Sequence, residues 1–162
     1  MMKINIFDFD GTLYYNPKND FTDRIDNQFA NFHFEMENAL NFLVTGRHVS
    51  QKQQIRIALG ERGYAFERSM FLELDKQVYQ RNDFMELYHQ WKIDGIISLI
   101  VILREILRDV HLIRIYDDDM KLLKKLIFEL ENNEIKNISL YHVKLFRYMK
   151  SGEIVKTCIK IL

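Results

Sequence analysis

The sequence predicts an α/β fold, a three-layer Rossmann-like domain with a mainly parallel sheet. Short apolar runs typical of strands alternate with amphipathic stretches typical of helices, and this alternation puts helices on both faces of a parallel sheet. Three predicted strands end in chemically active residues, at Asp8, Thr45 and Asp117-Asp118. Because ligands bind beyond the carboxyl ends of parallel strands, we expect one site there.

Length and composition favour a single domain spanning residues 1–162. Lys and Arg total 23, as do Asp and Glu, which argues against a uniformly basic nucleic-acid-binding surface and against an acidic disordered tail. The lone cysteine, Cys158, excludes an internal disulfide framework and a Cys-rich zinc site. No apolar run approaches the roughly 20 residues of a membrane span, and Asp8 and Asp10 interrupt any signal-peptide pattern. We therefore expect an intracellular, cytoplasmic protein with no membrane partner.

The first half of the chain predicts three strands and two helices. Residues 3–8 are a short apolar run that leads into an acidic turn. Residues 41–45, ended by Gly46, and residues 70–74 are the other expected strands, and a helix is expected over 50–59. Apolar residues three and four apart predict an amphipathic helix, and they are Phe21, Ile25, Phe29, Phe32, Met36 and Leu40.

The second half continues the alternation. Residues 84–108 predict a long helix in which Asp94-Gly95 is a candidate break. Residues 110–116 alternate apolar and polar side chains and lead into three aspartates. Residues 120–131 predict another helix, and two β-rich segments follow at 136–146 and 154–161.

The strongest chemical signal is the string Phe7-Asp8-Phe9-Asp10-Gly11-Thr12-Leu13. Asp8 ends the strand, so the loop can turn Asp10 back over it. Two carboxylates so placed can divide roles, one attacking and the other donating and accepting a proton. Gly11 permits the tight turn, and Thr12 can hold it by hydrogen bonding to the backbone. The alternative is an acidic strand-to-loop junction, although burying two acids without a cation or a proton is costly.

This string resembles the first motif of the haloacid dehalogenase (HAD) superfamily, whose members mostly transfer or hydrolyse phosphoryl groups through an aspartyl-phosphate. Leu43-Val44-Thr45-Gly46-Arg47 is similar to the second motif, and Ile113-Arg114-Ile115-Tyr116-Asp117-Asp118 is similar to the fourth. The third motif is a lysine at the start of a helix; Lys92 matches it best and Lys76 is its rival. The resemblance covers most of residues 3–131.

The resemblance implies a HAD core and a Mg²⁺-dependent phosphohydrolase. Asp8 would be the nucleophile, and Asp10 would protonate the leaving oxygen and later activate water. Thr45 would hold the phosphoryl oxygens, and Lys92 would offset the charge of the phosphate and of Asp8.

The resemblance also implies a magnesium site and a phosphate cradle. Mg²⁺ prefers carboxylate oxygens and keeps several waters. Asp119 has another interpretation, as the cap of the following helix. The implied ligands are Asp8, Asp118, the backbone carbonyl of Asp10, and Asp117 as the neighbour that supports Asp118. The implied substrate-binding residues are Gly11, Thr12, Gly46 and Arg47.

The segments between the motifs predict how open the site is. HAD enzymes often carry a cap domain, but residues 11–44 and 46–91 are too short for an independent one. We therefore expect a capless or minimally capped enzyme that can accept the end of a large substrate.

A narrower resemblance points to a substrate. The first motif, the following Asn16-Pro17-Lys18-Asn19, Thr45-Gly46-Arg47 and Gly63-Tyr64-Ala65-Phe66 are similar to the HAD domain of "Swiss Army Knife" RNA-repair-like proteins. Asp117-Asp118-Asp119 departs from the acid-Asp-Arg of that group. The resemblance implies a phosphorylated nucleic-acid end as substrate. Four residues are expected at the rim of the site: Tyr14, Tyr15, Lys18 and Arg47. They either stack on bases and contact phosphates or are ordinary loop residues.

Two alternatives remain at this point. One is a small-metabolite or nucleotide phosphatase, which the short inserts disfavour. The other is a HAD-like binding protein without turnover, which the complete set of acids disfavours. The five histidines have no metal-binding spacing, so we interpret them as structural or surface groups.

Overall fold

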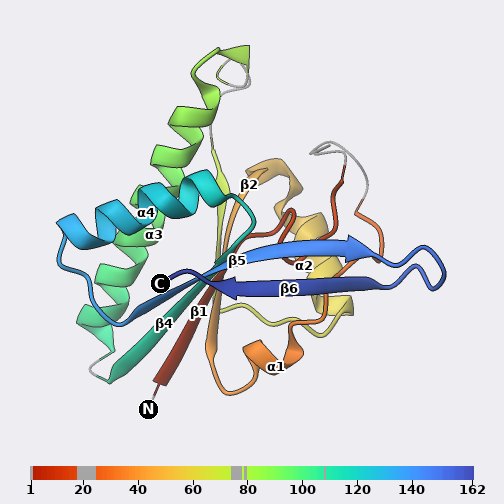
Figure 1. Ribbon diagram of the computed structural model, residues 1–162, viewed down its shortest axis with the longest axis horizontal. Helices are drawn as coiled ribbons and strands as arrows, with labels where there is room; N and C mark the ends of the chain where they lie inside the picture. Colours follow the sequence, from red (N-terminus) through yellow and green to blue (C-terminus); the bar gives the residue numbers. More distant parts are fainter. Residues whose placement is uncertain (1, 18–24, 74–77, 79, 108) are drawn as a thin grey trace.

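The computed structural model describes residues 2–17, 25–73, 78, 80–107 and 109–162, and its centre is a six-stranded sheet in the order β3-β2-β1-β4-β5-β6 (Figure 1). Neighbouring strands from β3 to β5 are parallel, and β6 runs antiparallel to β5. The predicted α/β fold with a mainly parallel sheet is therefore confirmed. The strands are β1 (Met2–Phe7), β2 (Leu40–His48), β3 (Arg68–Leu72), β4 (Val110–Asp117), β5 (Ile138–Arg147) and β6 (Ile154–Lys160).

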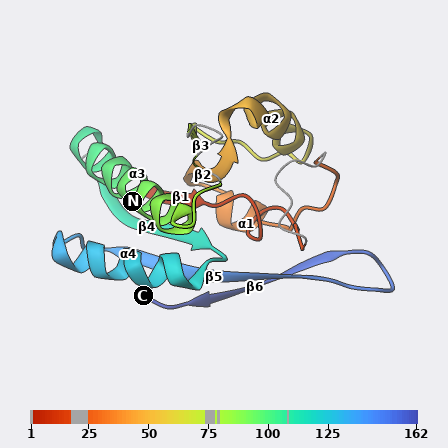
Figure 2. The same ribbon diagram turned by 90° about the horizontal axis from the view of Figure 1, so that it is seen from above.

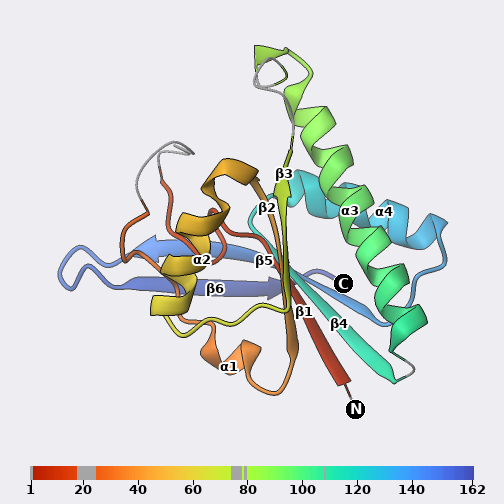
Figure 3. The same cartoon turned by 180° about the vertical axis from the view of Figure 1, so that it is seen from behind.

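Helices cover the sheet unequally. One face is covered by two long helices, α3 (Phe84–Ile106) and α4 (Met120–Asn132). The other carries the short α1 (His33–Met36), α2 (Lys52–Glu61), which follows a single 3-10 turn, and irregular chain (Figures 2 and 3). Between β2 and α3, the described residues add the 3-10 turn Val49–Gln51, α2 and β3, which are too small for a cap domain.

Two cores result from the period-two alternation of the strands. On β1, Ile4 and Ile6 point toward α3 and α4 and join an aliphatic cluster. Phe7 points the other way into a largely aromatic cluster, where it stacks on Tyr116 at 4.7 Å and meets Phe32 edge-on at 5.3 Å. Both clusters are buried directly below the carboxyl ends of β1 and β4, so the loops that follow these strands start from fixed positions.

The helix expected over residues 21–40 is wrong where the structure describes it. Residues 25–32 are irregular, only α1 is helical, and β2 already begins at Leu40. The apolar side chains are buried without a helix, because the irregular chain is held by long-range hydrogen bonds. The Ala30 N–H donates to the Leu13 carbonyl, and the Phe32 N–H donates to the Tyr64 hydroxyl, both at 2.9 Å. Residues 21–24 lie outside the described part.

Two elements continue through glycines, one where the sequence predicted the end of a strand (Gly46) and one where it gave a candidate break in a helix (Gly95). β2 continues through Gly46 to His48. α3 runs unbroken through Gly95. A Cβ at this position would lie 2.7 Å from the Met70 methyl carbon, so the glycine lets the helix pack closely on β3. The other predicted elements are confirmed to within a few residues. Across the described residues, no helix combines the length and apolarity needed to cross a membrane.

Candidate active site

The acidic loops of β1 and β4 meet because the two strands are parallel neighbours. Phe7 pairs with Tyr116, and the Asp8 N–H donates to the Tyr116 carbonyl at 2.9 Å. Asp8 and Asp117 therefore emerge side by side at the carboxyl edge of the sheet, where the sequence predicted a site.

A buried lysine links these two carboxylates. Lys92, on the inward face of α3, places its Nζ 2.7 Å from Asp8 Oδ1 and 2.6 Å from Asp117 Oδ2. The Tyr88 hydroxyl, one helical turn earlier, lies 3.2 Å from the same Nζ. The structure thus brings Lys92 to the predicted acids, whereas its rival, Lys76, lies outside the described residues.

Burial and charge act together on this group. Burial raises the pKa of Asp8 well above its usual value; Lys92 opposes that rise, and Asp117 and Asp118 add to it. Burial alone would lower the pKa of Lys92, but Asp117 and Asp8 outweigh it and raise that pKa well above its usual value. The lysine is therefore held as a cation among an excess of acids.

Asp118 completes an acidic triad. Asp8, Asp117 and Asp118 each offer a carboxylate oxygen, and these oxygens all lie within 4.8 Å of one another. Part of the Asp118 side chain reaches solvent, yet the protein packed around its carboxyl group, together with Asp117, raises its pKa to about 7. Gly11 makes room for it: a Cβ at that position would lie 2.2 Å from Asp118 Oδ2, and the φ of +74° suits only glycine well.

The formal charges of the site fit a divalent cation. When all four carboxylates, including Asp10, are ionised, they face two cations, Lys92 and Arg47, and two negative charges are not balanced. An oxygen-only donor set suits a hard cation such as Mg²⁺. Both oxygens of Asp117 already accept hydrogen bonds, from Lys92 and from the Asp119 N–H at 2.9 Å. Asp8 and Asp118 are therefore the better direct ligands of the three.

Asp10 faces a different partner. The Arg47 guanidinium binds it with both prongs, Nε to Oδ2 at 2.7 Å and Nη2 to Oδ1 at 2.6 Å. The Asn16 amide donates to the same Oδ1 at 2.9 Å. Arg47 is 1% exposed. A paired, charge-assisted contact of this kind fixes both geometry and orientation. In this arrangement both Asp10 oxygens serve as acceptors.

The residues of the predicted phosphate cradle lie in the last part of β2 and in the turn after β1. Thr45 is fully buried, and its Oγ1 accepts a hydrogen bond from the Arg47 N–H at 3.1 Å. At Gly46, a Cβ would lie 2.7 Å from the Tyr88 ring, so the glycine lets α3 approach. The prediction that the Thr12 hydroxyl holds the turn is wrong, because this hydroxyl has no hydrogen-bond partner among the described residues. Backbone contacts close the turn instead, among them the Gly11 N–H to the Tyr14 carbonyl at 2.8 Å.

Several neighbours support the site in ways that the sequence analysis did not assign. His142 Nε2 lies 3.0 Å from the Asp118 carbonyl, and His89 Nε2 lies 2.7 Å from Asp119 Oδ2. Asp119 also caps α4 by accepting from two backbone N–H groups, as its alternative interpretation expected. Tyr88 was missed, although its spacing of four from Lys92 puts both on one face of the helix.

The residues that were expected at the rim of the site lie in different surroundings. Tyr14 is buried and its hydroxyl bonds to Asp26, while Lys18 lies outside the described residues. Tyr15 lines a cavity of about 340 Å³ beside the acids, together with Gly11, Asp118, and residues 16–17 and 142–146. Another cavity, of about 430 Å³, lies at the other end of β4 and contains none of the predicted site residues.

No family model matches the chain, and no curated protein matches it. Among solved structures, the fold is similar to a chain in "Structure of the Pnkp1/Rnl/Hen1 RNA repair complex", with a TM-score of 0.51 and 17% identity. The match covers 80% of this chain and 40% of that one. The likeness establishes a shared fold, and this chain spans less than half the length of its structural neighbour.

Proposed function

We propose that this chain is a HAD-type phosphohydrolase that works through an aspartyl-phosphate on Asp8. The observation that carries this proposal is the acidic cluster at the carboxyl edge of the sheet, where Asp8 and Asp117 share one buried lysine and an Asp118 oxygen lies within 4.8 Å of an oxygen of each. A structural ion pair would need one acid for Lys92; two acids share it and a third lies beside them, which leaves negative charge that a divalent cation would neutralise. The bound cation would in turn attract a phosphate.

In the first half-reaction, an Asp8 oxygen attacks phosphorus, and the bond from phosphorus to the leaving oxygen breaks. The leaving oxygen keeps that electron pair and takes a proton from Asp10. In the second half, water attacks the aspartyl-phosphate while Asp10 removes its proton. The bond between phosphorus and Asp8 then breaks, which releases inorganic phosphate and restores the carboxylate.

Asp10 must leave Arg47 to do this work, because both its oxygens now accept hydrogen bonds from the guanidinium. A phosphoryl group is an equally good bidentate acceptor for arginine. Arrival of the substrate would thus give Arg47 a new partner and free Asp10 to receive or give a proton.

The remaining groups hold the charge in place. Lys92 would attract phosphoryl oxygens while its contacts with Asp8 and Asp117 orient the nucleophile. Asp8 and Asp118, with the Asp10 carbonyl, would hold Mg²⁺, which when bound offsets phosphate charge as a Lewis acid.

As substrate we propose a phosphorylated nucleic-acid end. The described elements build no cap over the site, so a long substrate can present its terminus. The motif resemblance to RNA-repair-like proteins, and a fold shared with a chain from an RNA repair complex, support the same substrate class.

The test is phosphate release from p-nitrophenyl phosphate with Mg²⁺ or with EDTA, beside an Asp8→Asn variant. We expect metal-dependent turnover that the variant loses. Single-stranded oligonucleotides with 3′ or 5′ phosphates, compared with mononucleotides, then test the substrate. Turnover retained by Asp8→Asn would overturn the mechanism, and a preference for mononucleotides would overturn the substrate assignment.

A further inference from the structure

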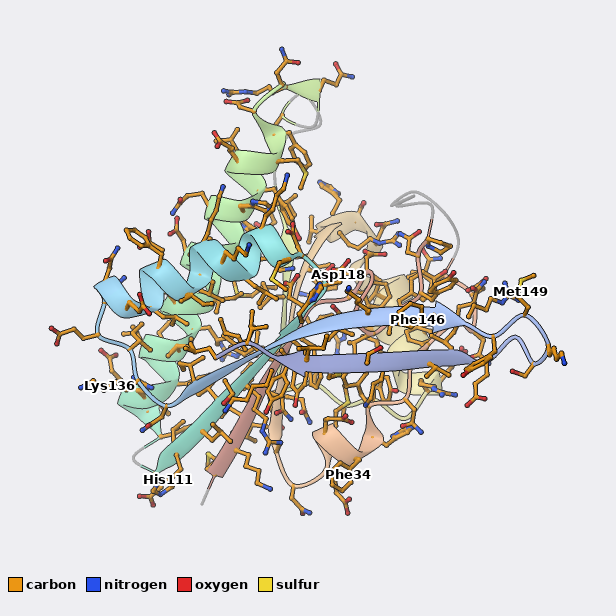
Figure 4. The ribbon with its side chains drawn as sticks, in the orientation of Figure 1. Phe34, His111, Asp118, Lys136, Phe146 and Met149 are labelled. Carbon is orange, nitrogen blue, oxygen red and sulfur yellow. The ribbon has the colours of Figure 1, made fainter. Side chains whose placement is uncertain are left out.

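The β5–β6 hairpin extends beyond the acidic site and presents one face toward it. His142 reaches the Asp118 carbonyl, so alternate residues of β5 share its side of the sheet, and these are Lys144 and Phe146. The antiparallel register adds Thr157 and Val155, opposite them on β6. In Figure 4, Phe146 lies on the hairpin between the position of Asp118 and the hairpin tip at Met149.

This face has no cover among the described residues. Leu140, nearer the core, packs in the aliphatic cluster that includes α4, but Phe146 is 53% exposed and Lys144 is exposed. The cavity of about 340 Å³ connects the face to the site: it reaches from Gly11 and Asp118 along β5 to Phe146, with Tyr15 among its other walls. A hollow beside an acidic site that is lined by an exposed aromatic ring and a lysine is a candidate binding surface.

The chemistry of the cavity suits a nucleic-acid strand. Lys144 is its cation, Tyr15 and Phe146 are its aromatic rings, and Asp118 is its only acid among the described lining residues. Aromatic rings beside a lysine are how proteins bind single strands, stacking on bases and pairing with phosphates.

We propose that this face binds the nucleotides next to the scissile phosphate of a single-stranded substrate, an inference that rests on the proposed function. A strand rises about 3.3 Å per residue, so Lys144 stands roughly 7 Å beyond His142 and Phe146 roughly 13 Å beyond it. Lys144 therefore contacts the next phosphate, and Phe146 stacks on a base farther in. Oligonucleotides of three or more nucleotides gain from both contacts, and mononucleotides gain from neither.

The test compares Lys144→Ala and Phe146→Ala with matched controls on the outer side of α4, Lys125→Ala and Phe128→Ala, whose side chains are exposed. The measured quantity is the ratio of kcat/KM for a 3′- or 5′-phosphorylated single-stranded 10-mer to that for p-nitrophenyl phosphate. Each hairpin variant should lower this ratio about 10-fold, and the α4 controls should keep it. Equal losses on both substrates, or no loss on the 10-mer, would overturn the proposal.

A binding measurement separates this proposal from the proposed function. Fluorescence anisotropy of a labelled 10-mer needs no turnover, and Phe146→Ala should weaken binding about 10-fold whether or not the protein hydrolyses phosphate. Failure of the wild type to bind the 10-mer would overturn the proposal. So would a concentration-dependent dimer, seen by sedimentation, that Phe146→Ala abolishes, because a second copy would then be what covers this face.

Discussion

The buried acidic centre and the exposed hairpin face lie next to each other but are built by opposite means. In the centre, Lys92 and Asp117 are 1% exposed and each has more than one polar partner. On the hairpin, Phe146 and Met149 are 53% and 100% exposed. Charges that are buried together cannot be removed singly without leaving an unpaired partner, whereas exposed side chains can. The centre is thus constrained by both stability and chemistry, and the hairpin is free to determine specificity.

The largest effect should come from the proposed nucleophile. Asp8→Asn keeps the shape of the side chain but cannot form the aspartyl-phosphate, so turnover of p-nitrophenyl phosphate should fall by about 10⁴-fold. Asp94→Asn, at an exposed acid of α3, is the matched control and should keep wild-type turnover. Residual activity above a tenth of wild type in Asp8→Asn would contradict the proposed role.

Removal of the central cation should cost stability. Lys92→Met leaves Asp8 and Asp117 buried without their shared partner, and the free energy of unfolding should fall by about 3 kcal/mol. Urea unfolding measures this, with Lys125→Met on α4 as a control expected to change it by less than about 0.5 kcal/mol. A loss below about 1 kcal/mol in Lys92→Met would show that the centre is less constrained than its geometry indicates.

The Arg47–Asp10 pair tests whether geometry or charge matters at the edge of the centre. Arg47→Lys keeps the charge but cannot hold a phosphoryl group with two prongs as arginine would, so turnover should fall by about 100-fold. Arg56→Lys, on the exposed side of α2, should leave it unchanged. Equal kinetics of Arg47→Lys and wild type would mean that a positive charge alone is sufficient.

A smaller effect is expected at the turn beneath Asp118. Gly11→Ala strains a φ of +74° and pushes a Cβ against the Asp118 carboxylate, so the free energy of unfolding should fall by about 1–2 kcal/mol. Titration calorimetry should also show weaker Mg²⁺ binding. Gly60→Ala, in α2 with open space around it, should instead stabilise the protein by about 0.5–1 kcal/mol. If both alanines behaved alike, the turn would not position Asp118.

The smallest effect is expected at the tip of the hairpin. Met149→Ser removes a fully exposed side chain, so the free energy of unfolding should change by less than about 0.5 kcal/mol. Thermal unfolding beside wild type measures it. A larger loss would mean that the tip is buried against something in solution, and the contrast between the two regions would then be weaker.

Sequence reasoning succeeded where one element supplies its own pattern. The strand that leads to Asp8, the strand that ends at Asp117, and the helices α3 and α4 were predicted to within a few residues because period-two and period-3.6 patterns are local. It failed at residues 25–32, where the spacing of the apolar residues is typical of a helix but the chain is irregular. Their side chains pack in the aromatic cluster all the same. Backbone N–H groups of this segment donate to the Leu13 carbonyl and the Tyr64 hydroxyl. No local sequence pattern reveals these distant acceptors.

The sequence alone determined the fold class and the residues that stand at strand ends, because alternation and turn residues act over short distances. Only the tertiary structure decided how those side chains pair. Arg47 pairs with Asp10 across 37 positions, and Lys92 reaches Asp8 across 84. The uncovered face of β5 was likewise invisible in the sequence. These relations depend on how strands pair and how helices pack, which is a property of the whole chain and of the burial that stabilises it.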